Sequence, residues 1–176
     1  MWRRFVIILA MSALPVASVH AIPITMQFAV TGFFDAFGNS SPPTDPVNGT
    51  IVFDAASVNS TINSLTSISM TIDGHAYSVG DLSFASLYSG NLDIIYATLN
   101  GISLVSGTND FLIAWDRSTL DDGLFGYSTS NDQDSFFVGT TFSSFSVTSN
   151  QIPEPGTLIL LGFGLAGLAA SRRRRQ

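Results

Sequence analysis

The chain has 176 residues, contains no cysteine and carries a formal net charge of −6. Without cysteine it has no disulfide, no thiolate nucleophile and no cysteine-ligated metal. Six of its seven basic residues lie in two terminal segments, so residues 22–152 carry one arginine against twelve aspartates, a formal charge of −11. Such a charge repels phosphate backbones, which excludes nucleic acid as a partner, and it attracts divalent cations or cationic polymers instead.

The N-terminal residues 1–21 have the pattern of a signal peptide. Arg3 and Arg4 form the positively charged start, and Phe5 to Leu14 is an apolar segment of the expected length. Val19-His20-Ala21 then places small or aliphatic residues before a cut, so we expect cleavage after Ala21 and export of the remainder. The paired arginines also suit the twin-arginine route. The general secretory route is preferred, because nothing in the chain suggests folding around a cofactor.

Residues 22–150 are predicted to form one passenger domain built from short strands. Ile24 to Phe34 alternates apolar and polar residues, the period-2 pattern of a half-buried strand. Asp73-Gly74 matches a two-residue type I′ hairpin turn, and Asn100-Gly101 is the strongest hairpin signal in the chain. Further strands are expected at residues 49–54, 67–72, 75–79, 82–88, 92–99, 102–105, 111–115 and 136–148.

Two longer connections separate these strands. Asp35 to Asn48 contains Pro42, Pro43 and Pro46, which forbid regular pairing. Thr119 to Asp134 is rich in Asp, Gly and Ser and is expected to be a long loop. Short strands with turns between them, and no convincing amphipathic helix, favour an all-β fold, namely an antiparallel β-sandwich or jelly roll.

Catalytic constellations are weak in this sequence. His75 is the single histidine after the signal peptide, and a Ser-His-Asp triad would need it as general base. No Gly-x-Ser-x-Gly elbow supports that role, and a histidine beside a hairpin turn is usually solvated. Glycoside hydrolysis needs two carboxyl groups that face each other across a cleft. Asp116, Asp121 and Asp122 could supply them, but the passenger has no glutamate, which is the more frequent acid in such pairs. We therefore expect a protein that is not an enzyme.

A calcium site is the one metal site that the sequence suggests. Hard oxygen ligands are concentrated in the acidic segment, at Asp121, Asp122, Asn131, Asp132 and Asp134. The EF-hand spacing is missing, because no glutamate follows at the required position. An acidic surface loop is more often solvated, so we expect no cofactor, with Ca²⁺ as the alternative.

Aromatic residues of the passenger offer a second class of function. Trp115, Tyr88, Tyr96 and Tyr127 could stack on sugars if they share an exposed face, whereas large aromatics in strands more often belong to the core. A carbohydrate-binding module or carbohydrate-active enzyme on the same sandwich is therefore the alternative function.

The C-terminal residues 151–176 combine three features in a fixed order. Pro153, Glu154 and Pro155 form a short motif, and the apolar, glycine-rich residues 157–171 are predicted to form one transmembrane helix. The helix is short for a hydrocarbon core of ~30 Å, so the arginines that follow must reach up to the membrane surface. By the positive-inside rule these arginines stay cytoplasmic and stop transfer, which places the passenger outside; they are Arg172, Arg173, Arg174 and Arg175.

This tail resembles the PEP-CTERM sorting signal, which exported proteins of Gram-negative bacteria carry and which the membrane-embedded cysteine transpeptidase exosortase processes. The resemblance is confined to the C-terminal segment, and a plain tail anchor is the alternative. It implies exosortase as a partner and a transient stay in the inner membrane with the passenger in the periplasm. It then implies deposition at the cell surface or in the extracellular matrix, in association with exopolysaccharide or biofilm.

We therefore expect an exported, non-enzymatic surface or extracellular-matrix protein that exosortase sorts and processes.

Overall fold

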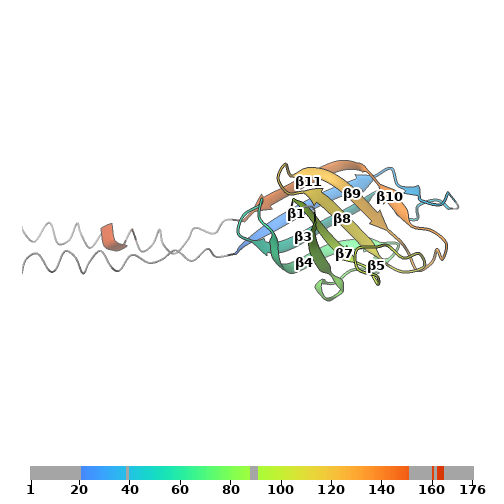
Figure 1. Ribbon diagram of the computed structural model, residues 1–176, viewed down its shortest axis with the longest axis horizontal. Coiled ribbons are helices and arrows are strands. Elements are labelled where there is room, and N and C mark those ends of the chain that lie inside the picture. Colours follow the sequence, from blue (N-terminus) through green and yellow to red (C-terminus); the bar gives the residue numbers. More distant parts are fainter. Residues whose placement is uncertain (1–20, 39, 88–90, 151–159, 161, 165–176) are drawn as a thin grey trace, which may run out of the picture. The chain divides into compact units, whose positions relative to one another are not determined.

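A computed structural model describes residues 21–38, 40–87, 91–150, 160 and 162–164 (Figure 1). Residues 21–151 form a compact unit of their own. Its elements are β1 (Ile22–Thr31), β2 (Phe34–Asp35), β3 (Val47–Ala55), β4 (Ile62–Ile72), β5 (His75–Ala76), the 3₁₀ turn η2 (Val79–Asp81), β6 (Ser83–Leu87), β7 (Leu92–Ala97), β8 (Phe111–Asp116), β9 (Asp121–Tyr127), β10 (Phe137–Gly139) and β11 (Thr141–Ser149).

The described strands form two antiparallel sheets, in agreement with the all-β prediction. One sheet has the order β11-β1-β3-β4-β5 and the other has the order β2-β10-β9-β8-β7-β6. The first and last strands lie side by side, since β1 pairs with β11 from Ile24↔Ser149 to Thr31↔Thr141 (blue and orange in Figure 1). The first and last strands of the passenger are therefore neighbours in the same sheet.

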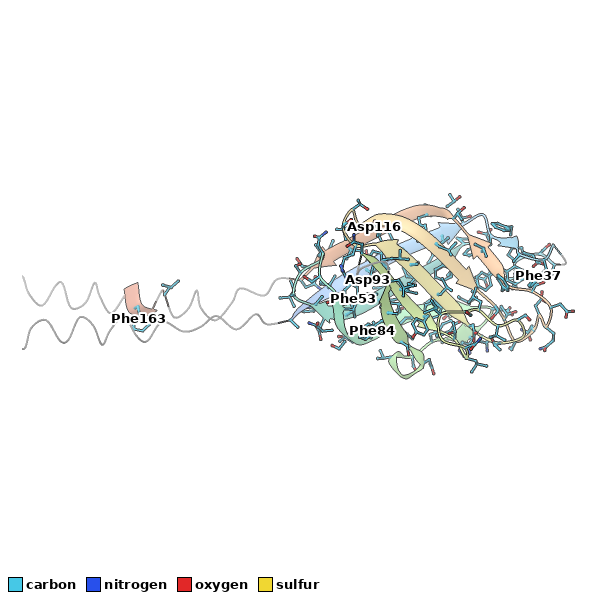
Figure 2. All side chains as sticks on the ribbon, in the orientation of Figure 1. Phe37, Phe53, Phe84, Asp93, Asp116 and Phe163 are labelled. Carbon is cyan, nitrogen blue, oxygen red and sulfur yellow. The ribbon has the colours of Figure 1, made fainter. Side chains whose placement is uncertain are left out.

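The hydrophobic core lies between the two sheets. In β1 the alternation predicted from the sequence is confirmed, because every second side chain from Ile24 to Val30 is buried. Ring pairs connect the sheets: Phe28 lies 5.5 Å from Phe125, and Phe53 lies 6.2 Å from Trp115, measured between ring centroids. Figure 2 labels Phe53 within the layers and Phe37 at one end, where Phe37 is 57% exposed.

The Asp73-Gly74 turn has the predicted geometry. Asp73 has φ 48° and Gly74 has φ 79°, and Ile72 pairs with His75 across the turn. Positive φ at both central residues defines a type I′ turn, the hairpin turn whose twist matches that of the strands.

The prediction of a second hairpin at Asn100-Gly101 is wrong. The turn closes only an isolated bridge, no strand forms at 102–105, and β7 pairs with β8 instead. The buried carboxylate of Asp110 explains the difference. Its Oδ2 accepts hydrogen bonds from the backbone N–H groups of Leu99 (3.4 Å) and Val105 (3.1 Å). A side chain therefore satisfies amides that a strand ladder would otherwise pair.

The prediction of a loop over residues 119–134 is also wrong in its first half, which contains β9. The strand pairs with both β8 and β10. Gly123 lies so close to β8 that a Cβ there would stand 2.1 Å from the carbonyl oxygen of Ala114. Glycine in this strand marks a close backbone approach rather than a break in pairing.

The two predicted terminal segments lie almost wholly outside the described residues. This applies to residues 1–20 of the signal peptide and to most of the predicted membrane span at 157–171, of which Leu160 and Gly162 to Gly164 are described and are helical. The part of the chain that the structure describes contains no helix with the length and apolarity needed to cross a bilayer.

Candidate functional site

The predicted processing residues are only partly described. Ala21 is exposed and stands directly before β1, so a cut after it would leave the first strand intact. The motif residues Pro153, Glu154 and Pro155 and the arginines Arg172 to Arg175 lie outside the described residues.

The five residues predicted as calcium ligands lie near the two ends of one strand, β9. Asp121 and Asp122 begin β9, whereas Asn131, Asp132 and Asp134 follow its far end. Seven residues of strand span roughly 20 Å, which separates the two groups beyond the reach of one ion. Among the described residues, no group of three or more histidine or acidic side chains is placed to hold a metal.

The later acidic residues instead stabilise their own loop. Asp132 accepts from the hydroxyl of Ser40 (2.5 Å) and from the backbone N–H of Asp134 (3.2 Å). Asn131 donates to the carboxylate of Asp73 at 2.8 Å. These bonds connect the loop before β10 to the β2–β3 connection and to the Asp73-Gly74 turn.

The aromatic residues considered as an alternative sugar-binding face do not share an exposed face among the described residues. Trp115 and Tyr127 are 1% and 0% exposed and belong to the core, so neither presents a ring to a ligand. Tyr96 in β7 is half-buried, and Tyr88 lies outside the described residues.

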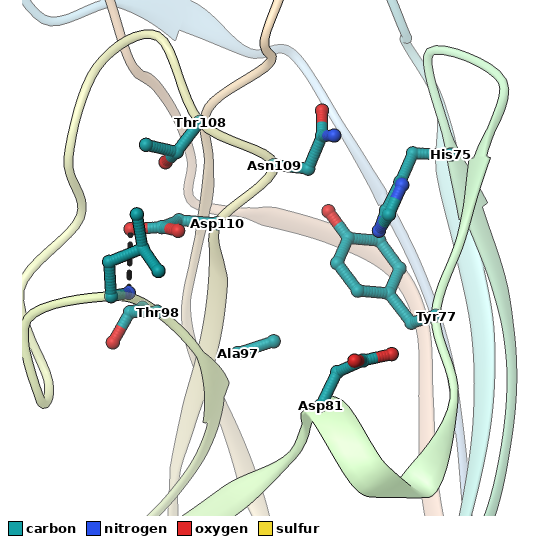
Figure 3. A pocket seen from close by; sticks show the side chains of 9 residues that line it. His75, Tyr77, Asp81, Ala97, Thr98, Thr108, Asn109 and Asp110 are labelled. Carbon is teal, nitrogen blue, oxygen red and sulfur yellow. Dashed lines mark hydrogen bonds between the residues drawn. The ribbon is translucent and has the colours of Figure 1, made fainter.

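A pocket of about 390 Å³ lies where the segment from β5 to η2 meets the β7–β8 connection (Figure 3). Its lining combines one imidazole, one phenol, two carboxylates, one amide and two hydroxyls with two apolar side chains. The lining residues are His75, Tyr77, Asp81, Ala97, Thr98, Leu99, Thr108, Asn109 and Asp110.

Tyr77 is the central side chain of this pocket. Its ring stands edge-on to His75 and to Phe111, with ring centroids 4.7 Å apart in each pair. The residue is only 6% exposed, and its hydroxyl is buried without a hydrogen-bond partner among the described residues. Figure 3 shows this hydroxyl pointing into the pocket, toward the side where Asn109 and Asp110 lie. Burial raises the pKa of Tyr77, and the charges of Asp110 and Asp81 raise it further, so the phenol stays protonated.

Two carboxylates give the pocket a negative charge. Asp110 is 3% exposed and is held by the two backbone amides at the ends of its loop. Asp81 is exposed and accepts from the hydroxyl (2.7 Å) and the backbone N–H (2.9 Å) of Ser78. Both bonds lower the pKa of Asp81, so it is ionised at neutral pH.

Sequence reasoning identified only His75 of this pocket. The alternation His75-x-Tyr77 after a hairpin turn was the one local signal for Tyr77, since both side chains then face the same way. Asp81 and Asp110 come from segments that only the fold brings together, so no spacing in the sequence indicates them.

Comparison with known proteins concerns the other end of the chain. Residues 151–175 match a family model for a protein-sorting motif, while no curated protein and no solved structure matches the chain. The chain is thus a protein with a C-terminal sorting signal. That signal is the PEP-CTERM motif, which indicates an exosortase-sorted protein and implies export to the surface or the extracellular space.

Proposed function

We propose that the chain is a non-enzymatic surface or extracellular-matrix protein, which exosortase processes at the inner membrane and which then associates with exopolysaccharide. The observation that carries this proposal is the sorting motif at residues 151–175. The passenger is the part that stays after processing, so its surface determines what it associates with.

The tail residues have separate roles in this proposal. Pro153-Glu154-Pro155 presents an extended segment to the transpeptidase, because proline fixes φ and disfavours helix just before it. Residues 157–171 hold that segment at the membrane face, and Arg172 to Arg175 keep the end of the chain cytoplasmic. Signal-peptide cleavage after Ala21 leaves the passenger in the periplasm before sorting.

The surface chemistry of the passenger supports association with a neutral or amine-bearing polymer. Its single arginine, Arg117, is 11% exposed and is bound to Asp93 at 2.9 Å. The charge of the passenger is therefore dominated by aspartates, which repel an acidic polymer. Outward-facing serines and threonines, as along β11, supply hydroxyls for hydrogen bonds to sugars.

The association is tested by fractionating cells that make the polymer and cells that do not. We expect the processed protein in the matrix fraction of the first and free in the medium of the second. An exosortase-deficient strain is the control and should hold the full-length chain in its membranes. Retention of the protein in the cell pellet, unchanged by loss of the polymer, would contradict the proposal.

A further inference from the structure

We infer that the pocket around Tyr77 binds one sugar unit of a glycan, a ring that carries several hydroxyl groups and no negative charge. This inference rests on the proposed association with exopolysaccharide, and it adds the place of contact and the class of sugar that fits there.

The buried hydroxyl of Tyr77 is the strongest observation for a ligand. A buried polar atom without a partner costs free energy, and nearly all such atoms in folded proteins are satisfied. His75 and Phe111 hold the ring from two sides, so the hydroxyl has a fixed direction before a ligand arrives. A ligand oxygen in the pocket would accept its hydrogen bond, and the binding site would need little reordering.

The carboxylates supply the complementary acceptors. The hydrogen bonds described for the carboxylates of Asp81 and Asp110 all engage Oδ2. An ionised carboxylate accepts up to about four hydrogen bonds, so each retains capacity for a ligand hydroxyl. Asn109 accepts from the backbone N–H of Ser130 through Oδ1, and its amide nitrogen can donate to the ligand.

The charge of the pocket decides between classes of sugar. Asp81 and Asp110 place two negative charges around the Tyr77 hydroxyl, which is why the pKa of that phenol is raised beyond the effect of burial. A uronic acid or a sulfated sugar would bring a third negative charge into the same space. A neutral hexose avoids this repulsion, and a hexosamine gains attraction.

The size of the pocket fits a single ring. A volume of about 390 Å³ stands at the lower end of the range for small-molecule sites, roughly 300–1,000 Å³. The lining also includes the apolar side chains of Ala97 and Leu99, against which carbon atoms of a sugar can pack. A longer stretch of polymer would have to extend out of the pocket.

Saturation-transfer NMR and calorimetry test this inference on the full-length chain in a zwitterionic detergent, which avoids detergents with sugar headgroups. The probes are methyl glucoside, glucosamine and glucuronic acid. We expect saturable binding of methyl glucoside and glucosamine and no binding of glucuronic acid.

In Tyr77→Phe the affinity for methyl glucoside and glucosamine should fall about tenfold, the effect of losing one hydrogen bond, while the thermal unfolding midpoint stays unchanged or rises. Tyr96→Phe, which alters a half-buried tyrosine outside this pocket, should bind as the wild type does.

A second variant tests the effect of the pocket's negative charge and leaves Tyr77 unchanged. Asp81→Asn removes one negative charge at an exposed position and should allow glucuronic acid to bind. The inference is overturned if no probe binds the wild type, if Tyr77→Phe binds as tightly, or if glucuronic acid binds the wild type as well as methyl glucoside does.

Co-sedimentation with the polymer distinguishes failure of the pocket inference from failure of the proposed function. If Tyr77→Phe still co-sediments as the wild type does, the pocket is not the contact, but the proposed function stands; if the wild type does not co-sediment, the proposed function fails.

Discussion

Two tyrosines of the core differ in what their hydroxyl groups contact. The hydroxyl of Tyr127 donates to the carbonyl oxygen of Thr44 (2.7 Å) and accepts from its backbone N–H (3.2 Å), which holds the β2–β3 connection against β9. The hydroxyl of Tyr77 is buried without a partner among the described residues. The same substitution therefore has different consequences at the two positions.

We predict that Tyr127→Phe lowers the free energy of unfolding by about 1 kcal/mol, because it removes two hydrogen bonds to a partly buried backbone. Tyr77→Phe is the matched control and should change stability by less than about 0.5 kcal/mol or increase it, since the Tyr77 hydroxyl has no hydrogen-bond partner to lose among the described residues. Urea unfolding of both variants measures the difference. Equal losses would contradict the assignment of the two hydroxyls.

Asp93 is a buried acid whose charge is balanced by one arginine. It is 1% exposed, accepts from Arg117 at 2.9 Å and accepts from Ser86 at 2.5 Å. Burial raises the pKa of Asp93, and this outweighs the lowering by Ser86 and Arg117. The folded state therefore takes up a proton at higher pH than the unfolded chain does. The contribution of Asp93 to stability accordingly increases as the pH falls from the raised pKa toward the ordinary value of 3.8.

We predict that Arg117→Met destabilises the passenger by about 2–3 kcal/mol at pH 7, because it leaves the Asp93 carboxylate buried without its cation. This loss should become smaller as the pH is lowered and Asp93 becomes protonated. The double variant Asp93→Asn/Arg117→Met is the control and should be less destabilised at pH 7. Urea unfolding at several pH values measures both effects, and a pH-independent loss in the single variant would argue against the pair.

At the scale of the strands, the pairing of β1 with β3 depends on a glycine. Gly49 stands opposite Phe28 in the register, and the Phe28 ring covers it so closely that a Cβ would lie 2.3 Å from the ring. Phe28 also packs against Phe125 of the opposite sheet, so the ring cannot move away freely. Gly49 thus connects the register of one sheet with the packing between both.

We predict that Gly49→Ala destabilises the passenger by about 1–3 kcal/mol through overpacking of Phe28. Gly80→Ala in η2 is the control, because the nearest neighbour of its Cβ among the described residues would be the Ser78 hydroxyl at an ordinary 3.7 Å. Thermal unfolding compares the two variants. A Gly49→Ala protein as stable as the control would mean that the Phe28 ring has room to shift.

Strand patterns were predictable from the sequence where burial alternates. The alternation in β1 and the Asp73-Gly74 turn are local features, and both are confirmed. The errors at Asn100-Gly101 and in β9 have distant causes, namely the Asp110 carboxylate and the close contact between Gly123 and β8. The sequence alone does not distinguish a glycine that permits a close backbone contact from a glycine that forms a turn.

The pocket was predictable only in part for the same reason. His75 was singled out because the passenger contains no other histidine, yet its place in the pocket depends on Tyr77 beside it and on Asp110 in the connection before β8. The sorting motif, in contrast, is a contiguous stretch of residues, and the family model confirms it at residues 151–175.

At the scale of the whole chain, we propose that the molecule consists of a passenger that remains and terminal signals that are removed. The described passenger is a two-sheet unit whose first and last strands pair with each other. Removal of the tail would therefore leave β11 intact, because the motif at 153–155 begins after the last strand ends at Ser149.

Intact-mass analysis of the protein from membranes and from the culture supernatant tests this account most directly. We predict a supernatant species that starts at Ile22 and ends close to Pro155, without Arg172 to Arg175. In Glu154→Ala the full tail should remain and the chain should stay in the membrane fraction. A wild-type chain that keeps its arginines and occurs only in membranes would contradict the account and make the tail an ordinary anchor.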